Sequence, residues 1–142
     1  MATVYTPLSR LSPTEAFIAL LVAAIETNHH ASAGEAARAE QVVHEVPRLR
    51  RLSRTTRGRI IEAMKAAVGD HGAAAVMAAA SEQLPAALHR PALIALADVM
   101  STHGLDRRES AALLDVARRF GFSPESTAAA LDEARRKRRS CD

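Results

Sequence analysis

Aromatic residues are scarce in this sequence. Its 142 residues include no tryptophan, one tyrosine and three phenylalanines. A core without large rings has to be filled by aliphatic side chains, and protein interiors are packed as densely as organic crystals. The abundant alanine and leucine therefore favour closely packed helices with small side chains where they cross. At this length we expect one domain with a single core, covering 1–142.

Cysteine and long apolar runs are also lacking. The lone cysteine, Cys141, excludes an internal disulfide. The N-terminus lacks the basic segment and apolar core of a signal peptide, and no apolar run reaches the roughly 18 residues of a membrane span. We therefore expect a cytoplasmic protein without a membrane span.

The sequence lacks the motifs of common enzyme classes. It contains no Gly-rich phosphate loop, no nucleophile elbow and no Cys/His pair in a plausible setting. The neighbours Asp70 and His71 look like an acid–base pair, but Gly69-Asp70-His71-Gly72 is typical of a break between helices. These observations predict a non-enzymatic protein.

Hydrophobic periodicity predicts an all-α fold of about seven helices, because no stretch alternates long enough to indicate a strand. Ser12-Pro13-Thr14-Glu15 has the N-cap, first-turn proline and N3 glutamate of a helix start, and the apolar helix that follows should be central and buried. Gly121 fits the C′ position that terminates the helix 107–120. The predicted helices are 12–27, 32–46, 55–69, 73–84, 91–102, 107–120 and one that starts at 124. Residues 1–11 are expected to be extended, and 135–142 to form a basic, disordered tail.

Two short segments, 28–35 and 98–109, share one plan. In each, a histidine comes after an apolar helix. Six residues after that histidine, a glutamate stands at the start of the next helix. An interval of 74 residues separates the two histidines and also the two glutamates. The four residues are His29, Glu35, His103 and Glu109. Neither helix pair can bury its apolar face alone, so the sequence predicts an internal pseudo-twofold repeat of 12–46 and 91–120.

The second segment resembles a known family. Residues 93–109, LIALADVMSTHGLDRRE, lead into leucine-rich turns and the ending Phe120-Gly121-Phe122-Ser123. This pattern is similar to the TerB-like (tellurite-resistance) family, whose relatives include the N-terminal domain of a DnaJ-like membrane co-chaperone. A weaker copy lies in the first half, and the resemblance covers 12–134. It implies a compact helical bundle with an internal repeat, acting as a stress-response or interaction module.

The resemblance also implies that acidic residues from both loops form a metal site. Glu35 and Glu109 match the family's acids at the helix starts, whereas His29 and His103 replace the family's loop Asp. Mixed imidazole and carboxylate ligands suit Zn, Mn, Fe or Ni better than Ca. We therefore expect that any divalent ion bound here belongs to the first group, with Asp98 as a nearby reserve ligand.

The same four residues have a purely structural interpretation. Glu35 and Glu109 stand three residues after Ser32 and Asp106, which is the spacing of a capping box. A loop histidine is commonly solvated. The residues alone leave both interpretations open.

The C-terminal part suggests an alternative function. The segment 113–139 resembles a helix-turn-helix DNA-binding motif followed by basic residues. Those residues, which would contact nucleic acid or an acidic partner, are Arg135, Arg136, Lys137, Arg138 and Arg139. Basic blocks attract phosphate but more often form a solvated face, and acids in the would-be recognition helix oppose base contacts. We expect a protein partner, with a second copy of the chain and a nucleic acid as alternatives.

Overall fold

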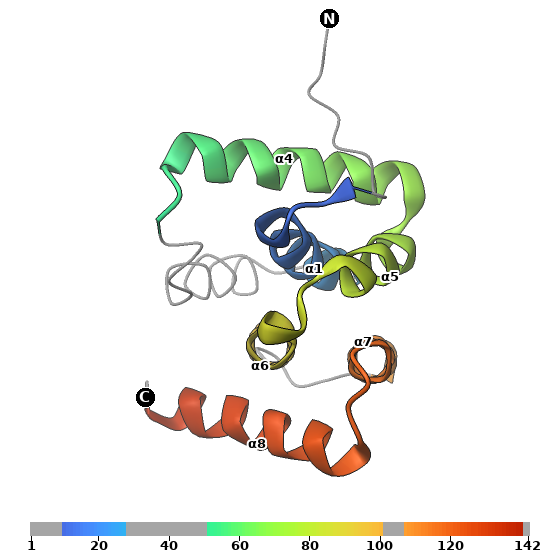
Figure 1. Ribbon diagram of the computed structural model, residues 1–142, viewed down its shortest axis with the longest axis vertical. Helices are drawn as coiled ribbons and strands as arrows, with labels where there is room; N and C mark the ends of the chain where they lie inside the picture. The colour runs from blue at the N-terminus through green and yellow to red at the C-terminus, as the bar shows by residue number, and fades with distance from the viewer. Residues whose placement is uncertain (1–9, 28–50, 101–106, 141–142) are drawn as a thin grey trace, which may run out of the picture.

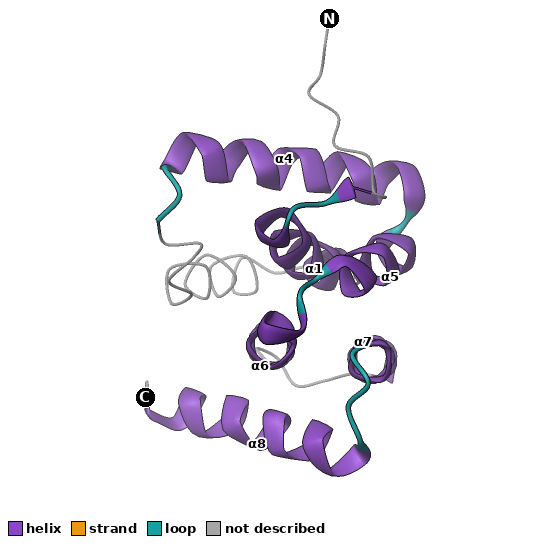
Figure 2. Ribbon diagram, in the orientation of Figure 1, coloured by secondary structure: helices purple, strands orange, loops and turns teal. Residues whose placement is uncertain are grey.

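The computed structural model describes residues 10–27, 51–100 and 107–140. Figure 2 shows that these parts consist of helices joined by short loops, without a strand among them. The helices are α1 (Pro13–Thr27), α4 (Arg54–His71), α5 (Ala73–Gln83), the short 3-10 helix η2 (Ala86–Leu88), α6 (His89–Met100), α7 (Arg107–Arg119) and α8 (Pro124–Ser140). The all-α prediction is confirmed for this part of the chain. The predicted helix 32–46 lies outside the described residues.

The helices are arranged in layers along the long axis of the view in Figure 1. Helix α4 lies at one end, α1 and α5 come next, α6 and α7 follow, and α8 covers the other end. Helix α1 contacts α4, α5, α6 and α7, whereas α8 packs mainly on α6. The N-terminal helix is therefore the centre of the bundle, and α8 is an outer layer.

Helix α1 is central because its sequence is apolar on every side. All nine residues from 16 to 24 are buried, and none is more than 6% exposed. Its start is fixed by a capping box: the Ser12 N–H donates to Glu15 Oε1 (2.8 Å), and the Glu15 N–H donates to Ser12 Oγ (3.1 Å). Reciprocal capping satisfies two of the amide groups that a helix start leaves open. The predicted start and the predicted burial of this helix are both confirmed.

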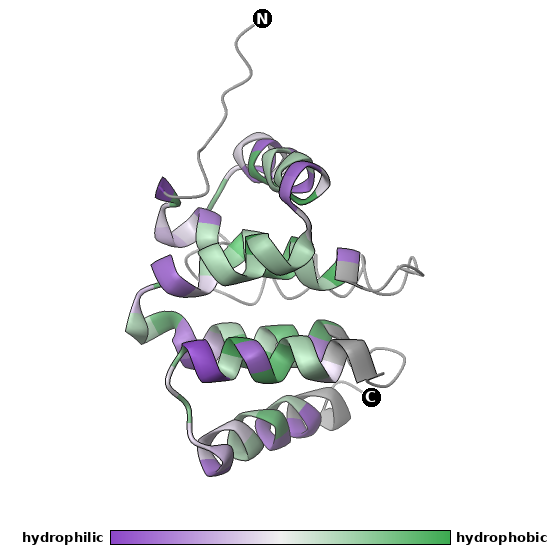
Figure 3. Cartoon of the chain, turned by 90° about the vertical axis from the view of Figure 1, so that its right-hand side faces the viewer, coloured by the Kyte–Doolittle hydropathy of each residue, from purple (hydrophilic) through white to green (hydrophobic). Residues whose placement is uncertain are grey.

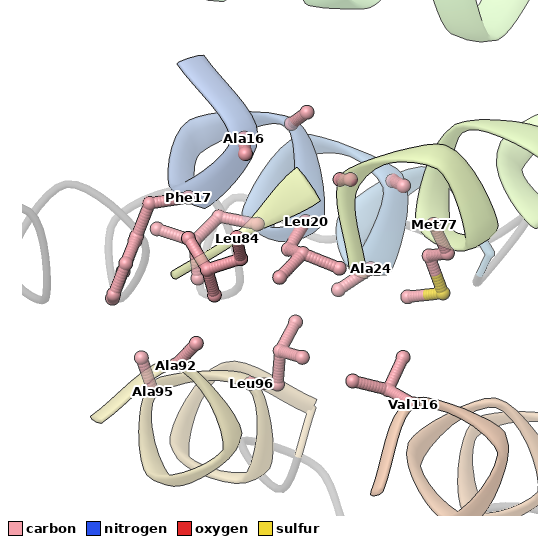
Figure 4. Close-up of a cluster of buried hydrophobic side chains, with 14 of the residues drawn as sticks. Ala16, Phe17, Leu20, Ala24, Met77, Leu84, Ala92, Ala95, Leu96 and Val116 are labelled. Carbon is pink, nitrogen blue, oxygen red and sulfur yellow. The ribbon is translucent and has the colours of Figure 1, made fainter. Parts of the chain in front are cut away.

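Helices α1 and α6 form the main contact between the two ends of the bundle. Figure 4 shows Leu20 of α1 and Leu96 of α6 pointing toward each other, with Ala92 and Ala95 beside Leu96. Leu20 is 1% exposed and Leu96 is fully buried. Alanines on the same face allow the helix backbones to approach closely, as the composition predicts. The predicted repeat of 12–46 and 91–120 stays a prediction, because helix 32–46 lies outside the described residues.

Two predicted boundaries are wrong by two residues. Helix α4 continues through Gly69 to His71 and is capped by Gly72, where φ is +90° and the N–H donates to the Val68 carbonyl oxygen (2.8 Å). Gly72 rather than Gly69 ends the helix because only Gly72 adopts the positive φ that terminates it. Helix α6 starts at His89, before Pro91, because a proline in the first helical turn gives up an N–H that has no partner there.

The C-terminal helix is longer than expected. Helix α8 reaches Ser140, so it includes most of the segment 135–142 that was expected to be a disordered tail. Arginine and lysine are good helix formers, and their charges are favourable near a helix C-terminus. An ion pair between Arg135 and Asp132 (3.8 Å) adds to this preference. A run of basic residues is therefore compatible with a helix at this position.

Candidate functional site

The proposed metal ligands lie mostly beyond the described parts of the chain. His29, Glu35 and His103 are outside the described residues, and Glu109 belongs to α7 with a side chain that is also outside them. No group of three or more His, Cys, Asp or Glu side chains that could hold a metal ion occurs among the residues that are described. Asp98, the reserve ligand, is 1% exposed in α6. Figure 3 shows that α1 and α6 run in the same direction, so that they end on the same side of the bundle.

A tight turn around Gly121 joins α7 to α8, which runs across the direction of α7 in Figure 1. The Gly121 N–H donates to the Arg118 carbonyl oxygen and the Phe122 N–H to that of Ala117, both at 3.0 Å. These two bonds and the φ of +78° at Gly121 define a Schellman motif, which confirms the predicted terminator. Ser123 then caps α8 by accepting the Ser126 N–H at its Oγ (3.1 Å). The turn between the helices is therefore fully determined by local hydrogen bonds.

The C-terminal end of α7 packs against the core. Phe120 is 8% exposed and stacks on the His89 ring. The His89 Nε2 lies 2.8 Å from the Leu84 carbonyl oxygen, and since a carbonyl oxygen only accepts, this nitrogen carries the donated proton. Leu113 and Val116 of α7 are also buried. These contacts hold the end of α7 against α5 and α6.

Helices α7 and α8 and the turn between them line an open, mainly apolar groove of about 460 Å³. Its lining residues are Leu114, Ala117, Arg118, Phe122, Pro124, Thr127, Ala128 and Leu131. Arg118 is the only charged residue in this lining. Leu114 is 56% exposed, which is more than any other large hydrophobic residue in the described parts of the chain. We call this feature the α7–α8 groove.

Ion pairs lie on the surface of α7 next to the groove. Asp115 accepts from Arg118 (2.6 Å) and from Arg119 (2.9 Å), and Arg119 also reaches Glu82 of α5 (3.3 Å). The hydrogen bond from Arg119, reinforced by that from Arg118, lowers the pKa of the Asp115 carboxyl below its ordinary value, although partial desolvation opposes the shift. Asp115 therefore stays ionised and keeps both arginines on the α7 surface.

Charges along α8 are separated by sign. Its N-terminal half carries Glu125, Asp132 and Glu133, and Glu133 pairs with Arg90 of α6 (2.7 Å). Arg135 and Arg136 are exposed in its C-terminal half. The other predicted contact residues, Lys137, Arg138 and Arg139, belong to α8, but their side chains lie outside the described residues. Exposed acids over the first part of α8 are unfavourable for a helix that reads bases in the major groove of DNA.

Sequence reasoning missed the α7–α8 groove, although one signal was present. Leu113 and Leu114 are adjacent in a helix, where successive residues point about 100° apart, so both cannot face the core equally. The structure buries Leu113 and exposes Leu114. A pair of leucines in an otherwise strongly amphipathic helix indicates a second apolar surface.

Comparisons of the chain with models of protein families, with curated proteins and with solved structures give no match. The structure itself adds one negative finding: in the described parts of the chain, no helix has both the length and the apolar character needed to cross a membrane. Function therefore has to be argued from the geometry of the chain.

Proposed function

We propose that this protein is a non-enzymatic interaction module that binds a protein partner through the α7–α8 groove. The observation that carries the proposal is the exposure of Leu114 at the edge of a groove with a mainly apolar lining. A single exposed leucine is normal in a soluble protein. An exposed leucine that continues into Phe122 and Leu131 forms a contiguous apolar surface, and such surfaces are typical of binding sites. Burial of this surface yields about 25 cal/mol per Å².

The groove has a rigid scaffold, which favours binding. Its turn is fixed by the Schellman motif at Gly121 and by the Ser123 cap. Buried Leu113 and Val116 hold α7 to the core, and α8 packs on α6, where Glu133 also pairs with Arg90 at the surface. A preformed surface loses less conformational entropy when a partner binds. A role as an interaction or stress-response module also agrees with the resemblance to the TerB-like family.

Site-specific photo-crosslinking tests the proposal. Benzoylphenylalanine replaces Leu114 in one variant and the exposed Ala66 of α4 in a matched control. We expect a discrete crosslinked protein species from position 114 that position 66 does not give. The additional substitution Ala128→Arg, which places a long charged side chain in the groove, should abolish that species. Equal crosslinking from both positions, or crosslinking that survives Ala128→Arg, would contradict the proposal.

A divalent metal ion between the two loops is a second candidate. One observation favours it: α1 and α6 end on the same side of the bundle, and the predicted loops follow these two ends in the sequence. His29, Glu35, His103 and Glu109 would hold the ion, which would link the two halves of the chain.

Elemental analysis of the purified protein tests the metal proposal, together with melting curves recorded with Zn²⁺, Mn²⁺ and a chelator. We expect bound metal and a metal-dependent rise in Tm that the double substitution His29→Ala/His103→Ala removes. The substitution His71→Ala, at an exposed histidine in the last turn of α4, serves as a control. Protein that retains no metal and melts identically with and without added ions would contradict this proposal.

A further inference from the structure

The α7–α8 groove combines an exposed apolar side chain with an open apolar lining. Leu114 is 56% exposed, and it lines the groove together with small and apolar residues that include Ala128 and Leu131. Leu114 therefore lies at the rim of the groove, where an opposing chain could bury it. In a twofold-symmetric dimer the same surface meets itself, so that each copy supplies both the exposed leucine and the groove.

The charges on α8 are also self-complementary, but only in one orientation. The half from 124 to 133 carries three acids and no base, whereas 135–139 consists of five basic residues. Two such helices side by side and parallel would place like charges together. Antiparallel packing places the acidic half of each helix next to the basic half of the other. Charge patterns of this kind select a partner and fix its orientation.

One acidic and one basic side chain of α8, Glu125 and Arg135, are accessible to a second chain. Glu125 is exposed in the first turn of α8. Arg135 is 63% exposed, and its contact with Asp132 is a long one at 3.8 Å. Arg135 also stands four residues after the groove residue Leu131, so both lie on the same face of the helix. A second chain that covers the groove would therefore meet Arg135 directly. Glu125 follows the groove residue Pro124 and points about 100° away from it, so it lies at the flank of the covered face.

We infer that the occupant of the α7–α8 groove is a second copy of this chain, related by a twofold axis, with the two α8 helices antiparallel and Leu114 of each copy in the groove of the other. This inference rests on the proposed docking function of the groove and names its partner. Apolar burial in the groove supplies affinity, and the two halves of α8 supply the orientation. An unrelated partner would need to match Glu125 near one end of α8 and the basic residues near the other, whereas the chain itself already carries this match.

Sedimentation equilibrium of the full-length protein over a wide concentration range tests the inference. We expect the mass to rise from the chain mass of 15.2 kDa toward twice this value. Leu114→Glu and Ala128→Arg should each raise the dimer Kd by about tenfold or more, which corresponds to the loss of a buried apolar contact. Ala66→Glu, an equivalent change on exposed α4, should leave the Kd unchanged. Circular dichroism and melting curves verify that each variant is folded.

Charge exchange tests the orientation. Glu125→Arg and Arg135→Glu should each weaken self-association, because each change brings like charges together twice in an antiparallel dimer. An equimolar mixture of the two variants should recover dimerisation, because acid and base then face each other at both positions. High salt should reduce this recovery.

Three results would overturn the inference. The first is a chain that stays monomeric at all concentrations, and the second is a dimer that Leu114→Glu and Ala128→Arg leave intact. A mixture of the charge variants that associates no better than each variant alone would exclude the antiparallel arrangement. A monomeric chain that still crosslinks from position 114 to a different protein would retain the proposed function while refuting the second copy as occupant.

Discussion

The rings of His89 and Phe120 lie flat against each other, with centroids 4.0 Å apart and planes inclined by 8°. His89 starts α6 and Phe120 follows the last residue of α7, so this stack joins the start of one helix to the end of the next. The same imidazole donates from Nε2 to the Leu84 carbonyl oxygen at the end of α5. One side chain thus connects α5, α6 and α7 at the point where the turn to α8 begins.

Substitution of His89 should therefore destabilise the protein. His89→Ala removes both the ring stack and the hydrogen bond, and we expect a loss of about 1–3 kcal/mol in the free energy of unfolding. His89→Phe keeps a ring and removes only the hydrogen bond, so its loss should be smaller. Urea denaturation measures both values, with His71→Ala as a control at an exposed position. Equal losses for the two substitutions would show that the stack contributes nothing.

The two glycines Gly121 and Gly58 should respond in opposite ways to the same substitution. A Cβ at either position would meet no atom within 4 Å, so packing does not decide the outcome. Gly121 has a φ of +78°, where a side chain is strained, and Gly121→Ala should destabilise the protein by roughly 1 kcal/mol. Gly58 lies inside α4, and Gly58→Ala should stabilise by about 0.5–1 kcal/mol. Thermal and urea unfolding of both variants check these signs, and a stabilising Gly121→Ala would exclude the left-handed turn.

Local features of the fold could be predicted from the sequence, because short segments encode them. The capping box at Ser12 and the terminator at Gly121 each depend on residues a few positions away, and both predictions are confirmed. The end of α4 was misplaced because Gly69 and Gly72 look alike in sequence, and only backbone conformation distinguishes them.

Features that depend on distant residues could not be predicted. The stack of His89 on Phe120 joins positions 31 residues apart, and no local pattern marks it. The groove depends on which of two adjacent leucines faces the core, and that choice is made by the packing of α7 on α5 and α6. The predicted metal ligands in the two loops stay a prediction.

The contribution of Asp115 to the free energy of unfolding should disappear at low pH. The pKa of Asp115 is lowered in the folded protein, so the carboxylate stabilises the fold above its ordinary pKa of 3.8. This contribution is lost as the pH falls through the lower pKa of the folded state. The difference in unfolding free energy between the wild type and Asp115→Asn should therefore be constant near neutral pH and shrink below pH 3.8.

Arg119 is the control for this pH dependence. Its hydrogen bond is the largest cause of the lowered pKa of Asp115. In an Arg119→Ala background, the further substitution Asp115→Asn should therefore change the free energy of unfolding by less, and the change should depend less on pH. Urea denaturation from about pH 7 to about pH 2 measures both series, a range that extends well below the ordinary pKa of Asp115. An unchanged pH profile in the Arg119→Ala background would contradict the assigned cause.

Substitution by alanine at Leu20 and at Leu114 should distinguish a core position from the proposed binding surface. Leu20 is 1% exposed at the centre of the bundle, whereas Leu114 is 56% exposed. Leu20→Ala should cost about 3–5 kcal/mol because it leaves a cavity in a dense core. Leu114→Ala should change the free energy of unfolding by less than about 0.5 kcal/mol in dilute protein, where little self-association occurs. Its effect should appear instead as weaker association at high concentration. If dilute Leu114→Ala protein lost as much stability as Leu20→Ala, Leu114 would belong to the core of the single chain, and the α7–α8 groove would not be a docking surface.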